Sequence, residues 1–245
     1  MDRSHTAVDL FEQVAPPQQV DTGVFSAAGR DSSHALFAPL HYEPGYAYPL
    51  IVWLHGPGDD ERQLLRMMSL VSMRNYVAVA PRGTAPAETG VGYTWRQTEA
   101  HIAGAEQRIT DNIAIARAKY HVAPHRVFLA GFDVGGTMAY RIALQYPDRF
   151  AGVISLGGPL PEGGHLFGRL NEIRRLSVLL AVGRDSHRYP AEQVCEHLRL
   201  FHTAGLSITL RQYPCGHELS PQMLADVDRW IIEHITSAEK TEVGS

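Results

Sequence analysis

The sequence predicts one α/β domain, a doubly wound and mostly parallel sheet with helices on both faces and no large cap domain. Apolar runs of strand type alternate with helical patterns along the whole chain, which is the order that gives such a layered sheet. Several runs are almost continuously apolar, as in strands that are buried on both faces. A further strand run, within 127–139, ends in a glycine-rich turn and passes directly into a helical pattern.

Composition limits the classes of function that remain. The 245 residues suffice for one large domain with a full core, and 44% are hydrophobic, 20% are charged and the net charge is −4. The chain has no excess of basic residues of the kind that would indicate a nucleic-acid or membrane partner. Cys195 and Cys215 have no metal-ligand spacing, so we expect reduced thiols, no metal and no organic cofactor. Without an apolar leader or a membrane-length run, we expect a cytoplasmic protein.

The first part of the chain is predicted to contribute two buried strands and one helix. Residues 1–33 are polar and broken by prolines, so we interpret them as an N-terminal arm, followed by a candidate edge strand over 34–40. The apolar run 50–54 is typical of a strand buried on both faces. A helix follows, with apolar residues at helical spacing over 64–71, and 76–80 is the next strand, ended by a proline.

The middle of the chain is predicted to form a long helix and the central strand. Ile102, Ile109 and Ile113 belong to one apolar stripe of a helix over about 97–119. The glycine-turn strand follows, and its helix runs to about residue 145. Residues 152–156 are predicted to form another buried strand, and residues 158–176 a loop or a short helix.

The last part repeats the alternation of strand and helix. Residues 177–182 form a strand, and the helix that follows ends at Gly205, a residue typical of helix C-termini. A strand over 208–213 precedes the final helix, which opens with a Ser-Pro pair suited to a first turn. The domain therefore spans 34–237, and 238–245 are a polar tail.

The turn at Asp133 is the most informative stretch. Gly131 and Gly135 lie two residues either side of it, and they let a strand and a helix approach closely around a strained turn. This geometry lifts one reactive side chain above a parallel sheet. Serine is the usual residue at this position, and here it is an aspartate.

Four loops at the carboxyl ends of the strands carry the remaining candidates for chemistry, because reactive groups gather at that edge of such sheets. They are Leu54-His55-Gly56-Pro57-Gly58-Asp59, the G-x-x-x-G-G turn at 131–136, Ser155-Leu156-Gly157-Gly158-Pro159-Leu160-Pro161 and Tyr213-Pro214-Cys215-Gly216-His217-Glu218-Leu219-Ser220. In this order the chain resembles the α/β-hydrolases, and among them the phospholipase/carboxylesterase family, over about 35–236.

The resemblance implies a set of catalytic residues. Asp133 takes the nucleophile position, Asp185 the acid that orients the base, and His217 the base, in the chain order expected of this fold. The spacing from Gly183-Arg184-Asp185 to Pro190 is one residue longer than usual, so a loop-capping role for Asp185 is an alternative.

The resemblance also implies an oxyanion site and a cleft. Gly56, Pro57 and Val134 occupy the positions around the oxyanion, and His55 is expected to order that loop. Tyr93, Trp95 and Arg82 are expected to line the cleft, with a role in the core as an equal alternative for Trp95.

The aspartate changes the chemistry that the site can perform. Carboxylate attack on an ester would build an anhydride, and the intermediate would collapse back because a carboxylate leaves more readily than an alkoxide. Toward a saturated carbon, as in an epoxide or an alkyl halide, a carboxylate is an effective nucleophile, and some α/β-hydrolase families do carry aspartate at this turn. Asp133 could instead cap the helix that follows it, or form an ion pair with His217.

Pro57 is a second departure from the family pattern. The residue after His-Gly is expected to donate a backbone N–H to the oxyanion, and proline has none. Loss of one such donor typically costs roughly 10² to 10³ in rate. Val134 is then the expected remaining donor.

Three hypotheses follow for function. The protein has lost esterase chemistry and is a pseudoenzyme or binding module, or it is a hydrolase that uses Asp133 as nucleophile on a saturated carbon, or it is a weak esterase in which His217 activates water. Any partner is expected to be a small-molecule substrate or ligand, and a homodimer is a further arrangement to consider.

Overall fold

The computed structural model describes residues 33–163, 166 and 168–243. Within them, seven strands form one sheet in the order β1-β3-β2-β6-β7-β8-β9, in which β1 pairs antiparallel with β3 and every other pair is parallel. The doubly wound, mostly parallel sheet predicted from the sequence is therefore confirmed. Its strands are β1 (His34–Phe37), β2 (Tyr48–Leu54), β3 (Val77–Pro81), β6 (Val122–Phe132), β7 (Gly152–Leu156), β8 (Ser177–Gly183) and β9 (Ser207–Tyr213).

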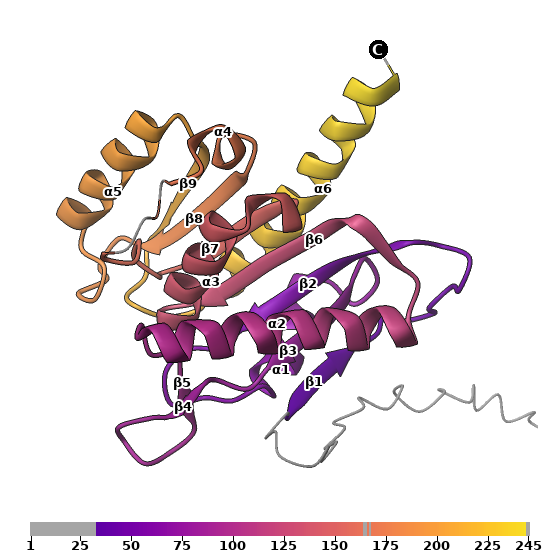
Figure 1. Cartoon of the computed structure of the whole chain (residues 1–245), viewed down its shortest axis with the longest axis horizontal. Coiled ribbons are helices and arrows are strands. Elements are labelled where there is room, and N and C mark those ends of the chain that lie inside the picture. The colour runs from indigo at the N-terminus through magenta and orange to yellow at the C-terminus, as the bar shows by residue number, and fades with distance from the viewer. Residues whose placement is uncertain (1–32, 164–165, 167, 244–245) are drawn as a thin grey trace, which may run out of the picture.

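Helices cover both faces of this sheet (Figure 1). One core cluster joins residues of α2, α3 and α5 to one face, and a second joins residues of α1 and α6 to the other. No helix in the described part of the chain combines the length and the apolar character that a membrane crossing requires. The helices are α1 (Gln63–Val71), α2 (Glu99–Lys119), α3 (Val134–Gln145), the 3₁₀ turn η1 (Pro147–Arg149), α4 (Leu170–Ile173), α5 (Ala191–Ala204) and α6 (Pro221–Val243).

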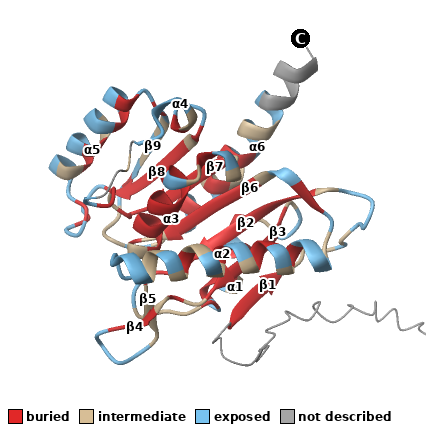
Figure 2. Ribbon diagram, in the orientation of Figure 1, coloured by how far each residue is buried: buried red, intermediate tan, exposed pale blue. Residues whose placement is uncertain are grey.

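Strands β2 and β7 are buried along their whole length (Figure 2), because both of their faces carry apolar side chains. In β2, Leu50 and Leu54 pack into the cluster under α2 and α3, whereas Ile51 and Trp53 pack into the cluster under α1 and α6. This division follows from the alternation of side chains along a strand. It explains why the run 50–54 looks continuously apolar in the sequence.

Several boundaries differ from the sequence prediction. A small hairpin of β4 (Ala85–Pro86) and β5 (Tyr93–Thr94) forms in the loop after β3, and its strands are too short to give a periodic pattern. Helix α6 continues to Val243, past residue 237 where the sequence pattern suggests a tail. The arm predicted over 1–33 lies outside the described residues except for Ser33.

The turn between β6 and α3 is tightly packed against the end of β2. A side chain at Gly135 would collide with the backbone carbonyls of Leu54 and His55 at the end of β2, and one at Gly131 would collide with Gly135 itself. Asp133 between them has φ 49° and ψ −120°. A non-glycine residue in this region carries strain of roughly 1–3 kcal/mol, which the surrounding backbone must hold.

We predict opposite effects for two glycine-to-alanine substitutions. Gly135→Ala should destabilise the protein by about 3 kcal/mol or more, because the rigid backbone of β2 cannot move away from the new methyl group. Gly104→Ala, in the interior of α2, meets only the Thr84 methyl at 3.6 Å, so it should stabilise by about 0.5–1 kcal/mol. Urea unfolding followed by circular dichroism measures both. Wild-type stability in Gly135→Ala would contradict the packing described here.

Candidate active site

Asp133 stands at the carboxyl end of β6 with its carboxylate turned away from the helix that follows. Its backbone N–H donates to the Leu156 carbonyl at 3.0 Å, which fixes the turn to β7. The side chain makes no capping hydrogen bond to α3, so the capping alternative is wrong. The carboxylate is 7% exposed, and its Oδ2 lies 3.0 Å from His217 Nε2 and 3.3 Å from Arg188 Nε.

His217 lies in the loop after β9 and reaches the same edge of the sheet. Its ring is tilted against Phe132 with a centroid separation of 5.3 Å. Gly157, which has φ 66°, provides the space on another side, where a Cβ would stand 3.1 Å from the imidazole Cε1. The buried Nε2 meets no acceptor among the described residues at a hydrogen-bonding angle, so its approach to Asp133 is an electrostatic contact rather than an aligned hydrogen bond.

Ser186 occupies the position where the sequence predicts an acid. Its Oγ lies 2.9 Å from His217 Nδ1, and it accepts the Tyr189 N–H at 3.2 Å. Ser186 is 5% exposed. The three side chains are therefore arranged in a chain from the Ser186 hydroxyl through the His217 imidazole to the Asp133 carboxylate.

The orienting role predicted for Asp185 does not fit the structure. The Ser186 N–H donates to the Gly183 carbonyl at 3.2 Å, which closes a four-residue turn with Arg184 and Asp185 at its centre. Side chains at the centre of this turn face solvent, and the Asp185 carboxylate, 63% exposed, contacts Arg184 at 3.3 Å. The extra residue in the spacing before Pro190 was the sequence signal for this change.

The groups at the two ring nitrogens of His217 are the reverse of those in a serine hydrolase. Ser186 Oγ accepts the Tyr189 N–H and, as a hydroxyl, can either donate to Nδ1 or accept from it. In the Ser-His-Asp arrangement the acid lies at Nδ1 and Nε2 serves as the base. Here a neutral hydroxyl lies at Nδ1 and the carboxylate lies at Nε2.

The loop after β2 offers few donors to an oxyanion. Pro57 is exposed on a turn and has no N–H, and the Gly56 N–H donates to Gln63 Oε1 at 3.3 Å. His55 is buried beneath this loop, where its Nε2 accepts the Gly83 N–H at 2.9 Å. Burial lowers the pKa of His55, which keeps the ring neutral for that contact. Val134, the first residue of α3, remains the expected donor.

Trp95 supports the loop of His55 from within the core, whereas Tyr93 and Arg82 are partly exposed. Trp95 is 2% exposed and its indole N–H donates to the His55 carbonyl at 3.1 Å. This core role was one of the two alternatives for Trp95. Arg82 pairs with the Glu61 carboxylate at 2.7 Å and stacks over the Tyr93 ring at 4.7 Å.

Fold and site together define the class of protein. A strained strand–turn–helix elbow, an imidazole from the loop after the last strand and a parallel sheet are the features of an α/β-hydrolase. The phospholipase/carboxylesterase family model matches residues 44–235, so the chain belongs to this family. Across 33–163, 166 and 168–243, no group of three or more His, Cys, Asp or Glu residues is arranged to hold a metal ion.

Known proteins agree with this assignment. The chain is 27% identical over 123 residues to a probable carboxylesterase of Oryza sativa subsp. japonica, covering 49% of this chain and 46% of the relative. It is 31% identical over 163 residues to an epoxide hydrolase of Caballeronia sordidicola, covering 63% and 43%. The chain thus spans less than half the length of these curated relatives. A carboxylesterase structure from Mesorhizobium loti has TM-score 0.68 at 18% identity, covering 82% of this chain and 94% of that one.

We predict that Ser186, and not Asp185, has a measurable role in holding the site. Ser186→Ala leaves His217 Nδ1 and the Tyr189 N–H without their partner, so it should cost about 1–3 kcal/mol of stability. Asp185→Ala removes an exposed group and should change stability by less than about 0.5 kcal/mol. Thermal or urea unfolding of the two variants gives the comparison. A larger loss in Asp185→Ala would mean that the acid orients the imidazole after all.

Proposed function

We propose that this protein is a member of the carboxylesterase family that binds a small molecule in the family's site without hydrolysing esters by a serine mechanism. The observation that carries the proposal is the carboxylate at the elbow, with His217 at 3.0 Å and Arg188 at 3.3 Å from the same oxygen. Both partners are basic side chains that hold that oxygen by electrostatic contact. Neither contact prepares it to attack an acyl carbon.

Ester hydrolysis is disfavoured at each step of the family mechanism. Attack by Asp133 would produce an anhydride, which is less stable than the ester and reverts. The oxyanion would find no N–H at Pro57 and an already bonded N–H at Gly56, and loss of one donor costs about 3 kcal/mol of transition-state stabilisation. The carboxylate of Asp133 and the missing N–H of Pro57 lie on different loops, so neither defect compensates for the other.

Activation of water by His217 is also disfavoured. A general base needs an unprotonated nitrogen toward the water that it deprotonates. Here the buried Nε2 faces the Asp133 carboxylate rather than solvent, whereas Nδ1 contacts the buried Ser186 hydroxyl. Ser186 is neutral, so it cannot stabilise an imidazolium as an acid would. This geometry supports the binding function over the weak-esterase hypothesis.

We predict that esterase chemistry can be installed in two steps. Asp133→Ser should give slow hydrolysis of p-nitrophenyl acetate and labelling by a fluorophosphonate, because an alcohol replaces the carboxylate beside His217. Adding Ser186→Asp should raise the rate further, by up to roughly 10³-fold, because an acid then faces Nδ1. Pro57→Leu in the same background should add more by restoring an N–H.

Wild type and Ser186→Asp alone are the matched controls for this series, and both should be inactive. Mass spectrometry of the labelled peptide locates the probe. Wild-type protein that hydrolyses the ester as fast as the variants would overturn the proposal. Variants that remain inert although folded would show that His217 is not placed to act as a base.

A second candidate function is alkyl transfer to Asp133 from an epoxide or an alkyl halide. Two observations favour it: the carboxylate is not used as a helix cap, and the chain is 31% identical to an epoxide hydrolase over 163 residues. The carboxylate oxygen would attack the saturated carbon and form an ester of Asp133. A halide would leave as the free anion, whereas an opened epoxide would keep its oxygen and take a proton from water to become a hydroxyl. Hydrolysis of that ester then requires water and a base.

We predict the fate of this ester from the groups that lie at the two ring nitrogens of His217. Because the base is poorly arranged, the alkylated protein should accumulate after incubation with an epoxide panel. The measurement is intact-protein mass spectrometry, followed by single turnover in heavy-oxygen water. Incorporation of heavy oxygen into Asp133 would establish turnover, and a mass increase without it would establish a trapped ester. With Asp133→Asn as the control, no mass change in wild type would eliminate this candidate.

A further inference from the structure

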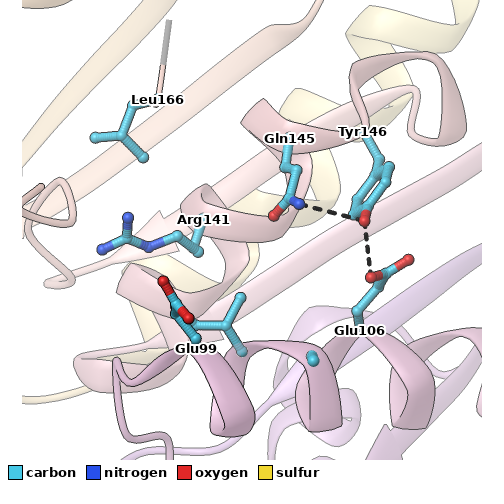
Figure 3. A pocket seen from close by; sticks show the side chains of 8 residues that line it. Glu99, Glu106, Arg141, Gln145, Tyr146 and Leu166 are labelled. Carbon is cyan, nitrogen blue, oxygen red and sulfur yellow. Dashed lines mark hydrogen bonds between the residues drawn. The ribbon is translucent and has the colours of Figure 1, made fainter. Parts of the chain in front are cut away.

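A cavity separate from the elbow lies between α2 and α3 and has a volume of about 490 Å³. Figure 3 shows its walls, with Glu99 and Glu106 from α2 on one side and, on the other, Arg141 and Gln145 from α3 and Tyr146 directly after it. The residues from α2 are spaced so that they share one helical face. Ile102 and Leu166 add apolar surface.

Arg141 is the unusual residue of this cavity. It is 9% exposed, and buried charges are normally paired with an opposite charge. Its Nε donates to Gln97 at 3.2 Å, and its two terminal nitrogens donate to the Gly163 and Glu162 carbonyls at 2.8 Å and 2.7 Å. All of these acceptors are neutral. Burial lowers the pKa of Arg141 without any carboxylate acting against it.

The guanidinium therefore has unused capacity. It presents five N–H donors, of which these contacts use three, so one hydrogen on each terminal nitrogen remains. Each of these hydrogens can donate to a carboxylate oxygen. No carboxylate in the described part of the chain is close enough to form an ion pair with Arg141.

The glutamates of the cavity do not supply the missing charge. Glu106 is already neutralised by Arg149 at 3.1 Å and accepts the Tyr146 hydroxyl at 2.8 Å. Glu99 is exposed at the rim, where water and salt screen its field. The buried Arg141 guanidinium, which has no carboxylate partner in the described part of the chain, should therefore determine the charge of the ligand more strongly than the exposed Glu99 carboxylate.

We propose that this cavity is a second binding site, for a small amphiphilic carboxylate whose anionic group pairs with Arg141 and whose apolar body lies against Ile102. Arg141 sets the sign of the charge. The mixed polar and apolar walls exclude a purely hydrophobic ligand as the best fit. The site is two helical turns along α3 from the elbow and needs no chemistry there.

The test compares three probes that share one tail: octanoate, octylammonium and octanol. With isoleucine-labelled protein, octanoate should shift the Ile102 methyl signal, and the Ile154 methyl, buried in β7, is the internal control. Octanoate should bind at least roughly tenfold more tightly than octanol, as a charge-assisted hydrogen bond implies. Tighter binding of octylammonium, or no preference between octanoate and octanol, would overturn the proposal.

Variants separate the charge from the fold. Arg141→Gln should abolish the preference for octanoate over octanol, Arg141→Lys should retain it in weakened form, and Glu99→Gln should leave or strengthen it. Thermal melting checks that each variant is folded. If Arg141→Gln unfolds, the contrast of Arg141→Lys and Glu99→Gln with wild type still decides, and a preference lost in Glu99→Gln would contradict the role of Arg141.

Discussion

The close approach of β2, β6 and the start of α3 is the constraint on which the site depends. Gly131 and Gly135 leave no space for a side chain at either point, so the backbone between them is fixed in position. Asp133 consequently takes a left-handed conformation that few side chains tolerate. The same geometry projects its carboxylate toward the loop that carries His217, and away from the N–H groups that an aspartate in a relaxed turn would cap.

An alcohol and a carboxylate have exchanged places around one imidazole. In a serine hydrolase the hydroxyl stands at the elbow and the acid lies behind the histidine. Here Asp133 is at the elbow and the buried Ser186 hydroxyl lies behind His217. All three residue types are retained, but the two ring nitrogens of His217 face the opposite partners. What separates a catalytic arrangement from a binding one is where each residue type lies around the imidazole, and not whether that residue type is present.

Much of the fold could be predicted because its signals are strong and local. The runs at 50–54 and 177–182 correspond to β2 and β8, and the stripe through Ile109 corresponds to α2. The elbow and the loop of His217 were also evident, and the structure brings Asp133 and His217 within 3.0 Å.

Ser186 could not be predicted in the same way. Which of two neighbouring residues faces the imidazole is set by the hydrogen bond that closes the turn from Gly183, and residue types alone do not encode that register. Arg188 gave no signal either, since an exposed arginine in a loop is ordinary. Trp95 looks the same in sequence whether it lines a cleft or supports one from below.

The two basic side chains around Asp133 differ in their contact with water, and this difference has a consequence for the site. The Arg188 side chain is 50% exposed, whereas that of His217 is 7% exposed. Dissolved ions shield interactions across solvent within about 8–10 Å at ordinary ionic strength, but they act weakly on enclosed groups. Rising salt should therefore weaken the contact of Arg188 with the Asp133 carboxylate while leaving His217 in place, so that access to the site depends on ionic strength.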